Sequence, residues 1–118
     1  MKIAPIFLCN INDLTATHAR SVELEIEDRI IDIMVVQQAD NIYTYHDRCP
    51  HAGTPLEWRE HDFLTEDKQH IMCATHGARF QIHDGLCVSG PCKQRSLSAL
   101  ESEVREDSVY LLELPTNN

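Results

Sequence analysis

The stretches CPHAG (residues 49–53) and CATHG (residues 73–77) decide the fold of this chain. Each stretch places one thiol close to one imidazole and follows the imidazole with glycine, and 21 residues separate His51 from Cys73. Thiolates and imidazoles are together suited to zinc and to iron–sulfur clusters. Motif 1 (residues 49–53) and motif 2 (residues 73–77) therefore predict a single metal site to which two loops contribute.

The mixed pairing within each motif favours iron–sulfur over zinc. Two thiolates and two imidazoles are the ligands of a 2Fe–2S cluster in which two histidines replace two cysteines on one iron. Structural zinc can use the same residue types, but a zinc finger usually pairs cysteine with cysteine and histidine with histidine, and zinc leaves the glycines unexplained. The predicted cofactor is one 2Fe–2S cluster, and its predicted ligands are Cys49, His51, Cys73 and His76.

The segment from Cys49 to Pro91 resembles the Rieske-type iron–sulfur domains, in particular soluble Rieske ferredoxins. The resemblance implies that both cysteines hold the inner iron, that both histidines hold the iron nearest solvent, and that Gly90-Pro91 begins a loop covering one side. It also implies that Gly53 and Gly77 leave room for the cluster and offer backbone N–H groups to sulfur. The matching residues are motif 1, Leu56, motif 2, Phe80, Gly85 and Gly90-Pro91.

The resemblance implies an all-β, Rieske-like fold made of small antiparallel sheets. At 118 residues the chain is expected to form a single Rieske domain, 1–118. A cluster-binding subdomain at 46–92 would be inserted into a basal β-sandwich made of strands from 1–45 and 93–118.

The resemblance also bears on the redox potential. High-potential members link their cluster loops by a disulfide, but this chain has Thr54 and Thr75 at the corresponding positions. Those members also place serine and tyrosine hydroxyls near the cluster sulfurs, where this chain has Ala78 and Phe80. Fewer donors to sulfur leave the reduced state less stabilised. We therefore expect a potential at the low end of the range of roughly −150 to +300 mV for such centres.

Alternation of apolar and acidic residues from Val22 to Glu27 predicts a half-buried strand, and the apolar run from Ile30 to Val36 predicts its hairpin partner. Asp28-Arg29 is the expected turn. A short helix is expected over 12–18. Further strands are expected at 42–45, 71–72, 79–82, 86–88, 97–104 and 109–114, with turns at 83–85 and near 106–107.

The formal net charge of −9 argues against nucleic-acid binding, because phosphates require clustered Lys and Arg. An acidic surface can serve solubility alone, or it can favour a basic protein partner. An acidic run in the segment between the motifs would be a contact for such a partner or a solvated loop. Its members are Glu57, Glu60, Asp62, Glu66 and Asp67.

No apolar stretch is long enough to cross a membrane, and the N-terminal residues do not form a signal peptide. We expect a cytoplasmic monomer. In the reducing cytosol Cys9, Cys87 and Cys92 are expected to be buried thiols rather than disulfides. Trp58 and Phe63 could form a docking surface for a partner, but lone aromatics in such a segment more often anchor it to the core, which is what we expect. Five histidines are expected on the surface: His18, His46, His61, His70 and His83.

The function these expectations support is electron transfer without catalysis by the chain itself. As a soluble ferredoxin, it would take one electron from a flavin reductase and pass it to an acceptor such as a ring-hydroxylating oxygenase. The first alternative is the small Rieske-like subunit of a nitrite reductase, which a permanent large partner would reveal. The second is a zinc-stapled interaction module, which would be colourless.

Overall fold

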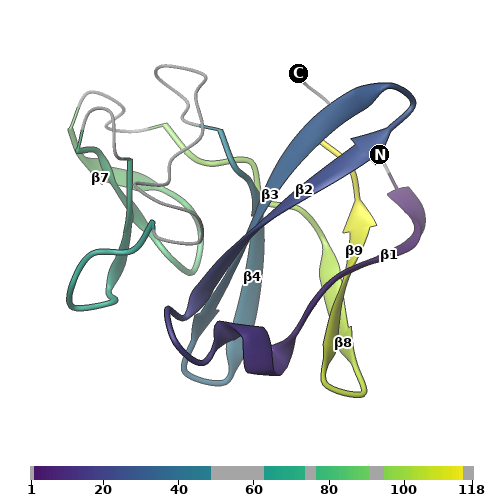
Figure 1. The fold of residues 1–118 in the computed structure, drawn as a ribbon. Coiled ribbons are helices and arrows are strands. Elements are labelled where there is room, and N and C mark those ends of the chain that lie inside the picture. Colours follow the sequence, from purple (N-terminus) through teal and green to yellow (C-terminus); the bar gives the residue numbers. More distant parts are fainter. Residues whose placement is uncertain (1, 49–62, 74–76, 91–94, 116–118) are drawn as a thin grey trace.

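The computed structural model describes residues 2–48, 63–73, 77–90 and 95–115. Strands in this part of the chain form three antiparallel sheets of three strands each, with orders β1-β9-β8, β2-β3-β4 and β5-β6-β7 (Figure 1). The fold is all-β, as the sequence predicts. The elements are β1 (Lys2–Asn10), the 3-10 helix η1 (Ile11–Leu14), β2 (Ala19–Ile26), β3 (Arg29–Gln38), β4 (Asn41–His46), β5 (His70–Met72), β6 (Arg79–Gln81), β7 (Cys87–Ser89), β8 (Ser102–Arg105) and β9 (Ser108–Glu113).

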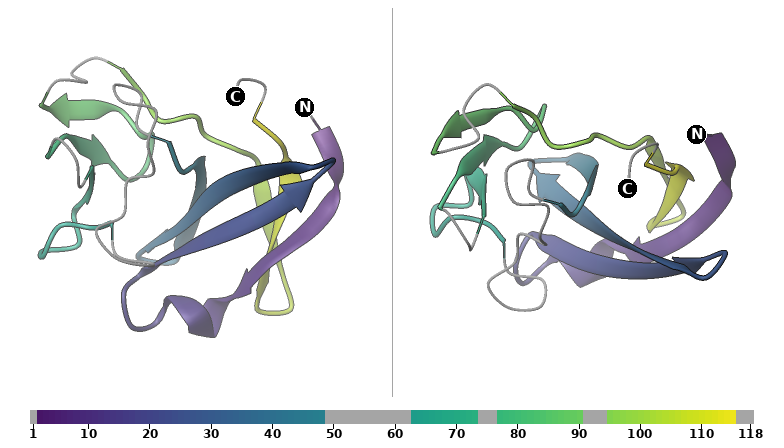
Figure 2. Two further views of the ribbon diagram at one scale, coloured as in Figure 1. Left: turned by 45° about the horizontal axis from the view of Figure 1, so that its top comes forward. Right: turned by 90° about the horizontal axis from the view of Figure 1, so that it is seen from above.

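The sheet β2-β3-β4 lies between the other two (Figures 1 and 2). Strand β3 shows why: Ile33 and Val35 belong to one apolar core, whereas Met34 and Val36 belong to another, and all four are fully buried. Successive side chains of a strand point to opposite faces, so β3 is covered on both sides. The continuous apolar run that predicted this strand is typical of such two-sided burial.

The first core, which we call the basal core, fills the space between the central sheet and β1-β9-β8. Val22, Leu24 and Ile26 of β2 pack against it, while Glu23 and Glu25 between them are exposed. The predicted half-buried strand is therefore confirmed. The buried members of the basal core are Leu8, Cys9, Leu14, Ile31, Ile33, Val35, Leu100, Val109, Leu111 and Leu114.

The second core, which we call the motif-side core, joins the opposite face of the central sheet to β5-β6-β7. Phe63 is fully buried in it, which confirms the expected anchoring of the inter-motif segment at this residue, whereas Trp58 lies outside the described residues. The buried members of the motif-side core are Ala19, Met34, Val36, Tyr45, Phe63, Leu64, Ile71, Cys73, Ala78, Phe80, Ile82, Cys87 and Leu97.

The β2–β3 hairpin forms as predicted, but its turn lies one residue earlier than expected. Ile26 pairs with Arg29, so the turn consists of Glu27 and Asp28, whose φ angles are 50° and 65°. Two positive φ angles match the right-handed twist of a two-residue hairpin. The β8–β9 turn repeats this arrangement at Glu106 and Asp107, with φ 48° and 68°, as expected for that position.

Other predicted boundaries were wrong. Strand β1 was not predicted, and the expected helix over 12–18 is only the 3-10 turn η1. The strand expected over 97–104 begins at Ser102, because the preceding segment passes from one core to the other. Leu97 is buried in the motif-side core and Leu100 in the basal core, and their N–H groups donate to the oxygens of Gly85 and Thr44, respectively.

Candidate metal centre

Of the four predicted ligands, the structure describes Cys73. Cys49, His51 and His76 lie outside the described residues, and so do Thr54, Thr75, Gly53, Leu56 and Pro91. The geometry of the site is therefore built from Cys73 and from the strands that lead into and out of the two motifs.

Strand β4 leads the chain into motif 1. It pairs with β3 from Asn41 to His46, and the Asp47 N–H extends this contact by donating to the Asp32 oxygen at 2.8 Å. The Arg48 N–H then donates to the His46 oxygen at 2.8 Å, which bends the chain away from β3. Asp47 is buried immediately before motif 1. The approach to Cys49 is therefore fixed to the central sheet.

Cys73 stands at the base of a closed backbone loop. Its N–H donates to the Ala78 oxygen, and its own oxygen accepts from the Gly77 N–H, both at 2.8 Å. The pairing of β5 with β6 on either side of this loop, with Met72 opposite Arg79, holds its two ends together. At this end of the paired strands the Cys73 side chain is fully buried.

Gly77 is required for its backbone conformation. Its φ is 68°, a value that glycine adopts without steric cost. A β-carbon on Gly77 would meet no atom of the described residues within 4 Å, and the Gly77 N–H donates to the Cys73 oxygen. In this structure the Gly77 N–H therefore donates to a backbone oxygen, and its reach to a cluster sulfur stays a prediction.

The surroundings of Cys73 are apolar. The motif-side core includes Ala78, Phe80 and Cys87 along with Cys73, and each is at most 2% exposed. A soft thiolate ligand in a water-excluded site suits the inner iron of a 2Fe–2S cluster, and burial of this kind is one of the factors that set its potential. The donor chemistry of Cys73, the one predicted ligand that the structure describes, therefore fits the predicted group.

Gly90 brings a third segment to the site. Its φ is 99°, and a β-carbon on it would lie 2.8 Å from the Ala78 Cα. The chain leading to Pro91 therefore runs directly against the residue that closes the motif 2 loop. This contact supports the expectation that the segment begun by Gly90-Pro91 lies beside the cluster.

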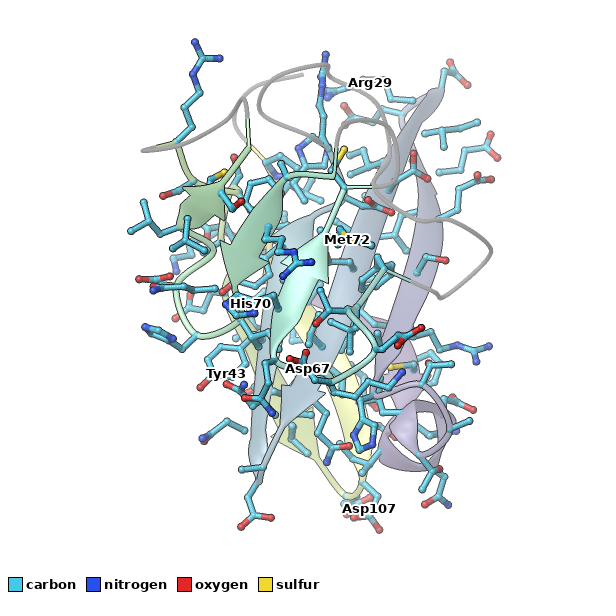
Figure 3. The ribbon with its side chains drawn as sticks, turned by 90° about the vertical axis from the view of Figure 1, so that its left-hand side faces the viewer. Arg29, Tyr43, Asp67, His70, Met72 and Asp107 are labelled. Carbon is cyan, nitrogen blue, oxygen red and sulfur yellow. The ribbon has the colours of Figure 1, made fainter. Side chains whose placement is uncertain are left out.

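The expected acidic contact is not supported at its C-terminal end. Glu66 and Asp67 precede β5, at the end of that strand opposite to Cys73 (Figure 3). Asp67 accepts hydrogen bonds from the Thr65 hydroxyl (2.6 Å) and the Gln69 N–H (3.0 Å), and these bonds hold the pKa of its carboxyl below its usual value. Asp67 therefore shapes the turn before β5. Glu57, Glu60 and Asp62 lie outside the described residues.

The remaining histidines and cysteines have separate surroundings. His18 and His83 are exposed as expected, but His46 and His70 are half-buried; His61 is not described. Burial, reinforced by Arg48, lowers the pKa of the His46 imidazole. Cys9 and Cys87 are buried free thiols in different cores. Cys92 lies outside the described residues.

The sequence placed Tyr45 in a strand and Gly85 in a turn and among the residues matching the Rieske pattern, but it gave no sign of a contact between them. The Tyr45 hydroxyl donates to the Ile82 oxygen, and the tyrosine ring lies against Gly85. Only a three-dimensional arrangement brings these residues together, because about 40 positions separate them in the chain.

Searching the described residues for three or more His, Cys, Asp or Glu side chains that could hold a metal ion gives no group, as expected when three of the four predicted ligands fall outside them. In the same ranges, no helix has the length and apolar character needed to cross a membrane.

Comparison with known protein families shows which family the chain belongs to. The Rieske [2Fe-2S] domain family matches residues 4–110, a span that includes both motifs. This chain belongs to the Rieske [2Fe-2S] domain family. Membership implies a Rieske cluster as the cofactor of this Rieske domain, in agreement with the sequence prediction.

Solved structures of similar fold include several Rieske ferredoxins. A chain in the complex of reduced oxygenase and oxidized ferredoxin in carbazole 1,9a-dioxygenase is 25% identical, with a TM-score of 0.70 and 92% of each chain covered. The carbazole 1,9a-dioxygenase ferredoxin of Nocardioides aromaticivorans IC177 is 19% identical (TM-score 0.72; 95% of this chain, 100% of that one). The Sphingomonas yanoikuyae B1 ferredoxin is 17% identical with the same TM-score and coverage. No curated protein sequence matches this Rieske domain.

Proposed function

We propose that this Rieske domain is a one-electron carrier, a low-potential ferredoxin whose cluster is held by Cys49, His51, Cys73 and His76. The observation that carries the proposal is the Cys73 thiol, fully buried in an apolar core at the base of the loop of motif 2. Cys49 and Cys73 would hold one iron of the cluster, and His51 and His76 would hold the other. When bound, the cluster supplies a one-electron redox couple.

The chain's own residues orient the ligands and exclude water. The backbone bonds of Asp47 and Arg48 direct the chain into motif 1, and the bonds between Cys73, Gly77 and Ala78 close motif 2. Ala78 and Phe80 line the buried side and offer no side-chain donor to sulfur. The negative charge that reduction adds to the cluster therefore gains little stabilisation there. This supports a potential at the low end of the Rieske range.

The partners we propose are a flavin reductase as electron donor and an oxygenase as acceptor. The fold is shared with ferredoxins of carbazole 1,9a-dioxygenase, one of which was solved in a complex with its oxygenase. The formal charge of −9 is compatible with basic docking faces on such partners. Nucleic acid is not a proposed partner, and the protein is proposed to act as a cytoplasmic monomer.

The test is low-temperature electron paramagnetic resonance (EPR) of the dithionite-reduced protein, with iron and sulfide quantified after anaerobic purification. We expect two irons and two sulfides per chain and a Rieske spectrum. Replacing His51 or His76 by Cys should abolish or change that spectrum, whereas His83→Cys at an exposed position should leave it intact. A colourless protein containing zinc, or an unchanged spectrum in both ligand variants, contradicts the assignment.

A further inference from the structure

Motif 1 and motif 2 are carried by different parts of the fold. Strand β4 of the central sheet ends at His46, three residues before Cys49, whereas motif 2 lies between β5 and β6 of the third sheet. A cluster held by both motifs therefore requires these two sheets to keep a fixed relative position. Within the described residues, no strand ladder joins β4 directly to β5-β6-β7. The segment 95–100 connects them through backbone bonds, since the His46 N–H donates to the Ser98 oxygen and the Leu97 N–H donates to the Gly85 oxygen.

The Tyr45 side chain adds a direct hydrogen bond from β4 to the hairpin of the third sheet. Tyr45 is 2% exposed and belongs to the motif-side core. Its hydroxyl donates to the backbone oxygen of Ile82, which directly follows β6 and is itself 1% exposed. A buried carbonyl that loses its donor is left unsatisfied, which is unfavourable, so this bond favours one position of β6 relative to β4.

The ring of Tyr45 makes a second contact with the same hairpin. A β-carbon on Gly85 would lie 2.9 Å from the Tyr45 Cε1 and 3.2 Å from the Leu97 Cβ. Gly85 has a φ of 74° and is fixed by two 2.8–2.9 Å backbone bonds, from its N–H to the Gln81 oxygen and from the Leu97 N–H to its oxygen. The β6–β7 turn is therefore shaped to receive the ring.

Burial is the main cause that raises the pKa of the Tyr45 hydroxyl above its ordinary value, and the nearby Asp84 and Tyr43 raise it further. The hydroxyl therefore keeps the proton that it donates to Ile82 to a higher pH than an exposed tyrosine would.

We propose that Tyr45 is a positioning residue for the cluster: by bonding Ile82 and packing on Gly85, it sets the position of the sheet carrying motif 2 relative to the strand carrying motif 1. The proposal rests on the ligand assignment under Proposed function. If both loops hold the cluster, loosening this link should change the EPR spectrum of the cluster and the rate at which iron is released.

The first variant is Tyr45→Phe, which removes only the hydroxyl. We expect broadened EPR lines in the reduced holoprotein. We also expect iron to be released to a chelator about tenfold faster, as for the loss of one buried hydrogen bond. Tyr43→Phe is the matched control, because it removes a hydroxyl from the same strand without touching Ile82, and it should behave as wild type.

A second control separates positioning from a general loss of stability. Val109→Ala opens a cavity in the basal core, where Val109 is fully buried between β1 and β8. It should lower the midpoint of unfolding without broadening the EPR signal. Gly85→Ala should act like Tyr45→Phe, because the new methyl group displaces the ring. The double variant with Tyr45→Phe and Gly85→Ala should release iron more slowly than the product of the two single-variant accelerations predicts.

The outcomes separate this inference from the proposed function. A wild-type protein without a Rieske spectrum overturns the proposed function and this inference with it. A wild-type Rieske spectrum that is preserved unchanged in both Tyr45→Phe and Gly85→Ala overturns the positioning role alone. Iron release in Tyr45→Phe that is no faster than in Val109→Ala overturns it as well.

Discussion

Gly90 and Ala78 are in direct backbone contact, so that a β-carbon added to Gly90 would lie 2.8 Å from the Ala78 Cα and 3.1 Å from its Cβ. The contact connects the end of β7 to the residue that closes the loop of motif 2. A backbone atom cannot move aside as a flexible side chain can, and the φ of 99° at Gly90 is itself unfavourable for any residue with a β-carbon.

We therefore expect Gly90→Ala to lower the free energy of unfolding by about 3 kcal/mol or more, since strain and a backbone clash are combined. Gly77→Ala is the matched control: it has a positive φ of 68°, but a β-carbon there would meet none of the described residues within 4 Å, so in the cluster-free protein only about 1 kcal/mol should be lost. Urea denaturation of both variants measures the difference. Equal losses would show that the contact with Ala78 is unimportant.

Hydroxyl groups added beside Cys73 should raise the midpoint potential. Ala78 and Phe80 are fully buried in the same core as Cys73, and we expect Ala78→Ser and Phe80→Tyr each to raise the potential by about 60 mV, which is a tenfold change in a one-electron equilibrium. Voltammetry of the holoprotein measures the shift. Ala99→Ser at an exposed position is the control, and an unchanged or lower potential in both buried variants contradicts the tuning argument.

Cys9 should be chemically inert while the basal core is intact. It is 2% exposed, and burial, with Asp13 adding to the effect, raises the pKa of its thiol to about 11. The thiolate is the reactive form, so at pH 8 iodoacetamide should modify Cys9 only after unfolding. Mass spectrometry of peptides after timed alkylation gives the rate. Rapid modification of the native protein at Cys9 would contradict its described burial.

The stability of the protein should fall as the pH is lowered from 7 to 5 because of His46. Burial and Arg48 lower the pKa of this imidazole below 6.5 in the folded state. The unfolded chain therefore takes up a proton at a higher pH than the folded one, and the stabilising difference is lost as the pH falls below 6.5. His46→Asn should flatten urea midpoints measured from pH 7 to pH 5. His83→Gln, at an exposed position, should leave the slope as it is; if the two variants behave alike, His46 is not the cause.

Glycine should be a better residue than aspartate in the β8–β9 turn. Asp107 has a φ of 68°, and an L-residue in that region costs roughly 1–2 kcal/mol, partly offset by the greater freedom of glycine in the unfolded chain. Asp107→Gly should therefore raise stability by about 0.5 kcal/mol. The same change at Asp13 should lower it, because the Asp13 carboxylate accepts from the Asn10 N–H at 2.9 Å. Thermal unfolding compares the two, and a destabilised Asp107→Gly protein would refute the expected gain.

Local patterns in the sequence were sufficient to predict strands that alternate between the core and solvent and strands that are buried on both faces. The alternation over Val22–Glu27 and the apolar run ending at Val36 each gave the correct strand. Failures occurred where the structure depends on distant partners. Strand β1 pairs with β9 from the far end of the chain, and the segment between Leu97 and Leu100 changes cores.

The candidate site likewise has residues that a local motif predicts and contacts that depend on distant segments of the chain. Cys73 could be chosen from its motif because the ligand spacing is local, and the structure places it in a buried position suited to that role. The closeness of Gly90 to Ala78 and of Tyr45 to Gly85 could not be predicted, because no short-range pattern specifies which backbone passes beside which. Strand order and register determine those contacts.

The division of β3 between two cores limits how far this protein could be reduced in size. A miniature containing only residues 46–92 would lack Ala19, Met34, Val36 and Tyr45, the wall that the central sheet contributes to the core around Cys73. Water would reach the thiol from that side, and the excised fragment would be expected to collapse or aggregate. An engineer who wishes to transplant this redox centre would have to carry the whole scaffold with it.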